Sequence, residues 1–394
     1  MNLQTQEEQS KLIENGNNKT ALITGILGQD GYWLTKLLLK NNYKVVGLHR
    51  RSSRQTPIYF SSFLENPNFS LVCGDITDFS STLRIIKDVQ PNLIFNLAAQ
   101  SQVGVSFNQP EYTFDVTAKG VLNLLECLRI LDLKSVRFYQ ASSSEMFGDN
   151  CNRRPTKYDE RNEPYEYNKY QDINTKFNPQ SPYAIAKVAA HQLCQLYRKA
   201  YGLDIRCGIL MNHESEYRGE EFVTRKITKW IGRYKVYRSN DMFELGHPDT
   251  QSKAWDFQFN NLDRFYNSNL DSKGFSKLKL GNLSSSRDWG HSEDYVRAML
   301  LIMQSDIPKD YIVSTGKTYT IEQFLEKVFT VASLNNWRDY VIIDDNLKRP
   351  SEVPYLKGDS YPIRRELGWR PLIDFDELVE RMVKHDIKEA LNDT

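Results

Sequence analysis

The sequence predicts an α/β protein, with a doubly wound parallel sheet followed by a smaller C-terminal α/β lobe. Short apolar segments alternate with segments of helical spacing from residue 20 to residue 210. Strands that are apolar throughout are typical of a parallel sheet with helices on both faces. Three glycines at regular spacing follow the first apolar segment directly, as they do in many such sheets. After residue 211 the alternation weakens, which indicates a second, smaller lobe.

The expected elements follow in chain order. A strand at 20–24, a glycine loop at 25–31, a helix at 32–40 and a strand at 43–48 form one strand–helix–strand unit. The remaining strands of the sheet are expected at 70–73, 93–97, 136–140 and 205–210, and its helices at 81–88, 116–131 and 183–201. The smaller lobe is expected to hold strands at 278–280 and 341–343 and helices at 293–305, 321–332 and 375–391.

Three regions divide the chain. Residues 1–18 are polar and without pattern, and they predict a disordered tail. Residues 19–210, with a polar insertion at about 149–180, are expected to form the domain of the doubly wound sheet, and residues 211–394, with an insertion at about 236–276, mainly the smaller lobe. Insertions of this length without periodicity are functional excursions or disordered segments. For the second insertion three roles remain open: a cover over the substrate, a subunit contact, or disorder.

Composition excludes several classes of function. The chain has 394 residues, 40% hydrophobic residues and a formal net charge of +1, which is typical of a globular protein and argues against a nucleic-acid or membrane-surface binder. The five cysteines are scattered and contain no pair at metal-binding spacing, so no metal site is expected. The sequence contains neither a signal-like apolar region nor a long apolar run, which favours a reducing, cytoplasmic location.

The glycine loop predicts a dinucleotide site. Gly25 would make the tight turn, Gly28 would let the backbone approach a pyrophosphate, and Gly31 would allow close packing of helix on sheet. The N-terminus of the following helix would then face the phosphates. The alternative is a tight strand-to-helix turn that binds nothing.

Residues at the end of the second strand indicate which dinucleotide. A site for NAD usually has an acid there for the ribose hydroxyls, about 20 residues past the loop. This chain instead has a basic segment, His49–Arg54, which includes Arg50 and Ser52 and suits the 2′-phosphate of NADP. The alternative is a solvated basic turn. Asp75, which ends the third strand, could bond an adenine amino group or serve only its own turn.

Chemistry is expected from two segments near one sheet edge. The fifth strand delivers Ser143 and Glu145 to the carboxyl edge, where open α/β sheets bind ligands. Tyr183 and Lys187 lie four residues apart at the start of a helix, and an ammonium beside a phenol favours the phenolate. Two other pairs, Tyr32/Lys36 and Tyr165/Lys169, have the same spacing, so the strand-end context selects the pair at Tyr183.

Glu145 adds a reaction that simple alcohol oxidation does not need. Ser143 and Tyr183 could flank a substrate hydroxyl for hydride transfer to a nicotinamide. A carboxylate beside the new ketone could remove a proton from the adjacent carbon, which permits elimination of a hydroxyl and return of the hydride. The alternative for Glu145 is an ordinary solvated carboxylate.

The chain resembles the GDP-mannose 4,6-dehydratase family of extended short-chain dehydrogenases/reductases, which have the Rossmann type of doubly wound sheet. The resemblance covers about residues 20–383 outside the two insertions. It rests on TGILGQDG at 24–31, RRSS at 50–53, NLAAQS at 96–101, FYQASSSE at 138–145 and SPYAIAK at 181–187. It continues through NHES at 212–215, FVTRK at 222–226, GNL at 281–283, RDWGH at 287–291 and RPSE at 349–352.

The resemblance implies a role for each matching residue. Ser143 would bond the sugar O4, Tyr183 would deprotonate it during hydride transfer to NADP⁺, Lys187 would also hold the cofactor ribose, and Glu145 would take the C5 proton and help to expel the C6 hydroxyl as water. The implied cofactor residues are Gly25, Gly28, Gln29, Asp30, Gly31, Arg50, Ser52, Asp75, Ile76, Leu97, Ala98, Ala99, Gln100, Ser101, Tyr112, Lys187, His213 and Arg218. The implied GDP-mannose residues are Asn212, Val223, Lys226, Arg287, Arg349 and Glu352.

The resemblance also implies a homodimer or homotetramer and a place in GDP-fucose biosynthesis. The chain departs from the family pattern at Gln102, where His is common, and at Glu216–Tyr217, where Pro is followed usually by Arg or Leu. An acid at Glu216 should weaken diphosphate binding unless it points away. An epimerase would need no Glu145, and a dTDP-glucose-type dehydratase would have an Asp-Glu pair at Ser144–Glu145. Those enzymes, and a catalytically silent NADP-binding protein, are the alternatives.

Overall fold

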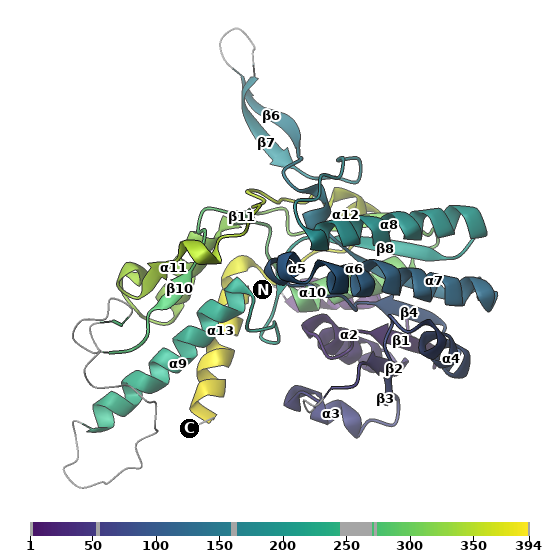
Figure 1. The fold of residues 1–394 in the computed structure, drawn as a ribbon, viewed down its shortest axis with the longest axis horizontal. Helices are drawn as coiled ribbons and strands as arrows, with labels where there is room; N and C mark the ends of the chain where they lie inside the picture. Colours follow the sequence, from purple (N-terminus) through teal and green to yellow (C-terminus); the bar gives the residue numbers. More distant parts are fainter. Residues whose placement is uncertain (1–2, 53–55, 159–163, 245–269, 272–273, 393–394) are drawn as a thin grey trace. The chain divides into compact units, whose positions relative to one another are not determined.

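The structure is a computed structural model that describes residues 3–52, 56–158, 164–244, 270–271 and 274–392 (Figure 1). The chain divides into two compact units. Unit 1 comprises Met1–Tyr217, Ser286–Tyr319 and Ser351–Phe375, and unit 2 comprises Arg218–Ser285, Thr320–Pro350 and Asp376–Thr394. Among the helices of the residues described, none is long and apolar enough to cross a membrane.

Unit 1 is built on a seven-stranded sheet in the order β13-β8-β5-β4-β1-β2-β3. Every pair of neighbouring strands in this sheet is parallel. The strands are β1 (Thr20–Thr24), β2 (Lys44–His49), β3 (Phe69–Cys73), β4 (Leu93–Asn96), β5 (Arg137–Ser143), β8 (Ile205–Leu210) and β13 (Asp310–Val313). The predicted parallel sheet is therefore confirmed.

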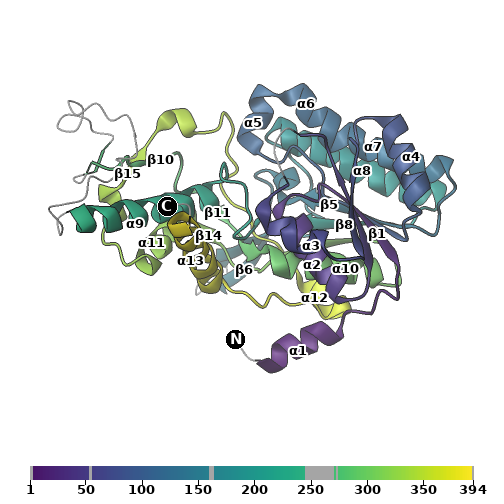
Figure 2. The same cartoon turned by 90° about the horizontal axis from the view of Figure 1, so that it is seen from below.

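Two hydrophobic cores cover the two faces of the sheet, which Figure 2 shows between its helix layers. On one face lie α2 (Gln29–Lys40) and α10 (Ser292–Gln304), which contribute Leu34 and Met299 to the core. On the other face lie α4 (Phe79–Val89), α7 (Gly120–Ile130) and α8 (Pro182–Tyr201). Because both faces are buried, the strands are mostly apolar on both sides, with few polar residues among them.

Strand order reverses between β1 and β4. The chain runs from β1 outward to β2 and β3, and then returns to place β4 on the other side of β1. The loops after β1 and β4 consequently diverge at their carboxyl ends, and open α/β sheets bind ligands in that crevice. The remaining elements of unit 1 are short: η1 (Ile58–Phe60), α3 (Ser61–Leu64), α5 (Val103–Asn108), α6 (Pro110–Phe114), the π-helix η2 (Asp115–Lys119), η3 (Ser144–Phe147), β9 (His213–Glu214), β11 (Ser286–Arg287), β12 (Gly290–His291) and α12 (Tyr361–Leu367).

The division of the chain differs from the predicted boundary at residue 210. The strand β13 and the helix α10 come from the C-terminal region that was assigned to the smaller lobe, yet both belong to unit 1. Eleven residues of α10 are buried, because the helix packs on α2 and covers the sheet. Sequence order alone does not show that these segments return to the sheet.

Two further segments differ from their predictions. The predicted disordered tail at 1–18 contains α1 (Leu3–Lys11), whose Gln9 is buried and bonds the carbonyl of Gly368 (2.9 Å) and the N–H of Arg370 (3.0 Å). The polar insertion at about 149–180 contains an antiparallel hairpin, β6 (Asn152–Tyr158) and β7 (Pro164–Tyr170), that is visible at the top of Figure 1. Backbone pairing organises the hairpin, so hydrophobic periodicity did not reveal it.

Unit 2 contains α9 (Val223–Glu244), α11 (Ile321–Val331) and most of α13 (Phe375–Asn392), with β10 (Leu278–Leu280) parallel to β15 (Val341–Ile343). Its core is aromatic: the ring of Trp230 lies 5.1 Å from that of Tyr234 and 6.1 Å from that of Phe329, centroid to centroid. Most of the insertion predicted at about 236–276 lies outside the described residues. The short elements β14 (Tyr319–Thr320), η4 (Trp337–Asp339) and η5 (Asp345–Leu347) complete the chain.

Candidate active site

The glycine loop after β1 leaves no room for side chains at two of its three glycines. Gly25 has φ +68°, and a Cβ there would lie 2.8 Å from the Cα of Ala98. A Cβ on Gly31 would lie 1.9 Å from the carbonyl oxygen of Ile26. At Gly28 the nearest atom to a Cβ is 3.5 Å away, so the protein itself does not fill the space beside this residue. The loop therefore has the tight turn, the close packing and the open side that a dinucleotide requires.

The helix α2 begins at this loop without a side-chain cap. Its N-cap residue is Gly28, which offers no side-chain acceptor to the first N–H groups. The uncapped N–H groups and the helix dipole favour an anion at this end. Together with Gly28, they fit a pyrophosphate.

Gln29 and Asp30, predicted to contact the cofactor, use their side chains to join α2 to the segment after β8. The amide of Gln29 donates to the carbonyl of His213 (2.8 Å), and Ser215 donates to Oε1 of Gln29 (2.9 Å). Asp30 lies 2.8 Å from Nε2 of His213 and also accepts from Ser292. The structure thus places His213 beside the glycine loop. The family resemblance implies a cofactor-binding role for this histidine.

The basic segment after β2 contains Arg50 and Ser52, both exposed. The guanidinium of Arg50 donates to the hydroxyl of Tyr112 and lies 6.0 Å from the centre of its ring. Asp75 has a turn role, because its Oδ1 accepts from the N–H (2.9 Å) and the hydroxyl (2.8 Å) of Thr77. The side chain of Ile76 is buried in the core, so only its backbone remains to meet a ligand.

The segment after β4 lies across the glycine loop. The N–H of Leu97 donates to the carbonyl of Thr24 (3.2 Å), and the N–H of Ala98 donates to its hydroxyl (3.3 Å). Ala98, Ala99 and Gln100 are half-buried, and Ser101 is exposed. They therefore border the crevice predicted for the cofactor.

Gln102, where the family pattern has His, caps the helix that follows. Its Oε1 accepts from the N–H of Val105 at the start of α5, and its own N–H donates to Oε1 of Gln100 (2.8 Å). Gln100 in turn donates to the hydroxyl of Thr113 (3.0 Å). In this chain Gln102 thus supplies the N-cap of α5 and helps to hold Gln100 in place.

β5 ends at Ser143, and Glu145 follows in the first turn of η3. The hydroxyl oxygen of Ser143 accepts from the N–H of Glu145 (3.2 Å), which leaves the hydroxyl hydrogen to donate to a ligand. Glu145 is only 9% exposed, so it is not the solvated surface carboxylate of the alternative interpretation.

The helix α8 begins with a hydroxyl cap and a proline. The hydroxyl of Ser181 accepts from the N–H of Ala184 (3.1 Å), and Pro182 occupies the first turn, where its missing N–H costs nothing. This start places Tyr183 in the first turn, with a side chain that is 7% exposed.

Lys187 connects that turn to β5. Its ammonium donates to the carbonyl of Ala141 (2.7 Å) and lies 5.8 Å from the ring centre of Tyr183. Burial lowers the pKa of Lys187 to about 8, against the opposing effect of Asp30. The ammonium therefore lies beside the phenol at the carboxyl edge of the sheet, as predicted.

A buried chain of hydrogen bonds, which the sequence did not reveal, runs across three strands to the same carbonyl. Thr24 donates to Asn96 (2.6 Å), Asn96 donates to Gln140 (2.8 Å), and Gln140 donates to the carbonyl of Ala141 (3.2 Å). These residues are register partners on β1, β4 and β5. The available signal was three polar residues in strands that are otherwise apolar, which buried sheets tolerate only when the groups are bonded to one another.

Glu145 faces an arginine from the C-terminal part of the chain. Nη2 of Arg287 lies 4.0 Å from Oε1 of Glu145, and both side chains are about nine-tenths buried, at 8% and 11% exposed. Nη1 of Arg287 donates to the carbonyls of Ser286 (3.0 Å) and Val353 (2.8 Å), which fixes the guanidinium. The structure thus joins a predicted catalytic residue to a predicted substrate residue, with half-buried Glu352 next in the chain to Val353.

Two neighbouring positions bear on the substrate prediction. The carbonyl oxygen of the Asn212 side chain is buried and has no hydrogen-bond partner among the residues described, so it is an acceptor available to a ligand donor. Glu216, the acid that departs from the family pattern, lies 3.2 Å from Nε2 of the buried His291. His291 therefore offers the carboxylate of Glu216 a partner within unit 1.

The other predicted ligand residues belong to unit 2. Val223 begins α9, and the guanidinium of Arg218 lies 3.5 Å from the ring centre of Phe222. Burial lowers the pKa of Lys226, although Asp344 acts in the opposite direction. Arg349 is half-buried. Ser143, Glu145, Tyr183 and Lys187, by contrast, all belong to unit 1.

Comparison with known proteins agrees with the motifs. A family model described as GDP-mannose 4,6 dehydratase matches residues 22–258 and 252–382. GDP-mannose 4,6 dehydratase 2 of Arabidopsis thaliana is 43% identical over 383 residues, covering 94% of this chain and 88% of the relative.

Solved structures share the fold at lower identity. A UDP-glucose 4-epimerase of Thermus thermophilus in complex with NAD matches with a TM-score of 0.70 at 19% identity, covering 93% of this chain and 98% of that one. RMD from Pseudomonas aeruginosa complexed with NADPH matches with a TM-score of 0.64 at 18% identity, covering 94% and 100%. At these identities the likeness concerns the doubly wound fold, whereas the family match spans most of the sequence. The chain belongs to the GDP-mannose 4,6-dehydratase family.

Proposed function

We propose that this protein converts GDP-mannose to GDP-4-dehydro-6-deoxy-mannose and water, with NADP as its bound cofactor. The observation that carries the proposal is the position of Glu145, a buried carboxylate two residues beyond Ser143 and 4.0 Å from Arg287. An oxidoreductase or an epimerase of this fold needs a hydroxyl and a phenol, but elimination of water needs a second base. Membership in the family supports the same reaction.

The residues around the glycine loop fit a nicotinamide dinucleotide. Gly25, Gly28 and the start of α2 would hold the pyrophosphate, because there is space beside Gly28 and no side chain caps the first N–H groups of the helix. The exposed Arg50 suits a 2′-phosphate, and no acid follows β2 to bind the ribose of NAD. When bound, the nicotinamide supplies the chemistry of accepting a hydride from sugar C4 and returning it to C6. The two solved structures of the same fold, one in complex with NAD and one with NADPH, support a cofactor of this class.

Oxidation at C4 is carried out by side chains at the end of β5 and at the start of α8. Ser143 donates a hydrogen bond to the sugar O4, since its own oxygen is already bonded to the N–H of Glu145. Tyr183 removes the O4 proton, and the ammonium of Lys187 beside its ring stabilises the phenolate. The C4 ketone that forms acidifies the proton on C5.

Elimination falls to Glu145. The carboxylate removes the C5 proton and, now protonated, gives a proton to the departing C6 hydroxyl, so that water leaves and a C5–C6 double bond forms. As C6 is reduced, C5 takes up one proton, which balances the proton that Tyr183 removed from O4, so the reaction has no net redox change. Arg287 and Asn212 would bind the nucleotide and keep C5 at the carboxylate, since a buried guanidinium suits a diphosphate.

The test is a substrate comparison with purified protein. GDP-mannose with NADP⁺ should give a 4-keto-6-deoxy sugar, detected by its absorbance in alkali, while dTDP-glucose and UDP-glucose should give none. NAD⁺ in place of NADP⁺ should bind at least tenfold more weakly, because a 2′-phosphate contact is lost. No product from GDP-mannose, together with turnover of another nucleotide sugar, would refute the substrate assignment. Light scattering of the same sample should give the mass of a homodimer or homotetramer, which we also propose.

A further inference from the structure

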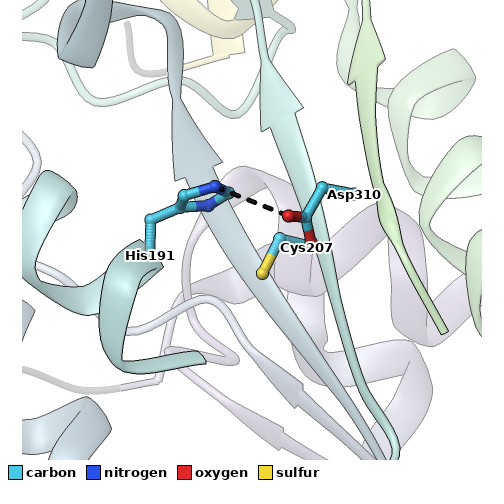
Figure 3. Close-up of side chains that lie close together, drawn as sticks. All are labelled: His191, Cys207 and Asp310. Carbon is cyan, nitrogen blue, oxygen red and sulfur yellow. Dashed lines mark ion pairs between the residues drawn. The ribbon is translucent and has the colours of Figure 1, made fainter. Parts of the chain in front are cut away.

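Behind the proposed active site lies a buried polar cluster of His191, Cys207 and Asp310, from α8, β8 and β13 (Figure 3). Their ligand atoms lie within 4.8 Å of one another, as the donors of a metal site would. A positive charge is already present, however. The guanidinium of Arg198 pairs with Asp310 and lies 3.8 Å from the sulfur of Cys207, and burial holds the pKa of this thiol well above its ordinary value. Arg198 therefore neutralises Asp310, and a cation would be repelled.

The hydrogen bonds define how His191 is protonated. The amide nitrogen of Gln195 lies 2.8 Å from the carboxylate of Asp310 and 3.1 Å from Nε2 of His191. An amide nitrogen can only donate, and its two hydrogens supply both contacts. Nε2 of His191 is therefore an acceptor, so the ring hydrogen is on Nδ1. Nδ1 lies 2.9 Å from the hydroxyl oxygen of Ser142 and donates to it.

This bond attaches α8 to β5 immediately before the proposed catalytic serine. Ser142 precedes Ser143 in β5, and His191 lies one helical turn beyond Lys187 in α8. Successive turns of α8 thus bond successive residues of the strand: Lys187 bonds the carbonyl of Ala141, and His191 bonds the side chain of Ser142. Two bonds of this kind fix both the translation and the rotation of a helix against a strand. His191 is 1% exposed, so water does not compete for the bond.

We propose that His191 is a positioning residue for the dehydration, which acts by holding Ser142 and thereby setting the separation of Ser143 and Tyr183. The inference rests on the proposed function, in which those two groups flank the sugar O4. Lys187 has a second task there, because its ammonium must also serve the phenolate and the cofactor ribose. When that ammonium turns away from Ala141, the bond from His191 to Ser142 keeps α8 in register with β5. Gln195, which Asp310 holds through its own hydrogen bond, orients the imidazole from its far side.

Two substitutions at His191 separate positioning from mere stability. Asparagine places its amide nitrogen where Nδ1 stood, so His191→Asn keeps the donor to Ser142 and loses the contact with Gln195. Glutamine reaches the position of Nε2, so His191→Gln keeps the contact with Gln195 and loses the donor to Ser142. Both lose the same imidazole, which lies 5.5 Å from the ring of Phe177, so both should lower the unfolding midpoint in urea. We expect kcat of His191→Asn within about twofold of wild type and kcat of His191→Gln about tenfold lower, with KM for GDP-mannose unchanged in both.

A second pair keeps the inference testable if either variant folds poorly. Ser142→Ala should lower kcat about tenfold, and Ser142→Ala combined with His191→Gln should be no slower than either alone, because the two residues act through one bond. Equal kcat for the Asn and Gln variants, or additive losses in the double variant, would overturn the inference and leave the proposed function intact. A wild-type protein that does not dehydrate GDP-mannose would overturn both.

Discussion

Replacing Lys187 by methionine should make the protein more stable while removing its activity. The ammonium is buried, and burial lowers its pKa from the ordinary 10.5 to about 8. This difference corresponds to roughly 3 kcal/mol that the folded state loses by keeping the group charged at neutral pH. Methionine forfeits the hydrogen bond to Ala141, worth about 1 kcal/mol, so the expected net gain is about 2 kcal/mol. Gln140 still donates to that carbonyl in the variant.

The gain should depend on pH in one direction. Below pH 8 the lysine is charged in both the folded and the unfolded state. The difference in free energy of unfolding between the variant and wild type then has its maximum value. Between pH 8 and 10.5 the folded wild type releases its proton while the unfolded chain keeps it, so wild-type stability rises and the advantage of the variant disappears. Urea unfolding of the cofactor-free proteins at pH 7 and pH 10 measures both values.

The exposed Lys199, on the same helix, provides the matched control. Lys199→Met should change the free energy of unfolding by less than about 0.5 kcal/mol at either pH, since a surface change away from buried features has little effect. If Lys187→Met is less stable than wild type at pH 7, or differs from it equally at both pH values, then burial does not disfavour the ammonium and the reasoning fails.

Four other changes test the proposed site. Glu145→Gln should abolish dehydration by at least about a hundredfold while slow reduction of the cofactor by GDP-mannose continues, because only elimination needs this base; equal loss of both steps contradicts the assignment. Gly31→Ala forces a Cβ to 1.9 Å from the carbonyl oxygen of Ile26 and should cost about 3 kcal/mol of stability in urea unfolding. Gly28→Ala, where a Cβ meets nothing within 3.4 Å, should retain stability yet lose cofactor affinity in a binding titration, and a loss of folding instead would show that the space belongs to the protein. Arg50→Ala should weaken NADP binding about tenfold without affecting NAD, and an equal effect on both would remove Arg50 from the 2′-phosphate site.

Motifs made of residues close together in the sequence predicted the parallel sheet and the positions of the glycine loop, Ser143 and Tyr183. The glycine loop, the strand before it and the helix after it are contiguous, so their pattern is readable without knowledge of distant partners. The same holds for Ser143 and Tyr183, each of which lies beside its own strand end or helix start. Context at those ends favours the pair Tyr183/Lys187, at the start of α8, over Tyr32/Lys36, which lies in α2.

Contacts between residues far apart in the chain could not be predicted from the sequence patterns. The approach of Arg287 to Glu145 depends on how β11 returns to the sheet unit, which no spacing encodes. Gln102 and Glu216 were visible as departures, but their partners, a helix N-terminus and His291, are set by packing. The four-residue strand β13 is too short for its apolar pattern to identify the sheet it joins.

The return of the C-terminal chain to unit 1 has a consequence for synthesis on the ribosome. The apolar faces of α2 and its strands are made early, but α10, which covers them, is made only after residue 292. Until then this face of the sheet has α2 but lacks α10, and exposed apolar surface of this kind invites aggregation. The edge of β8 likewise stays unpaired until β13 has been synthesised. A nascent chain that stops at residue 210 therefore holds every predicted catalytic residue and still lacks a finished sheet.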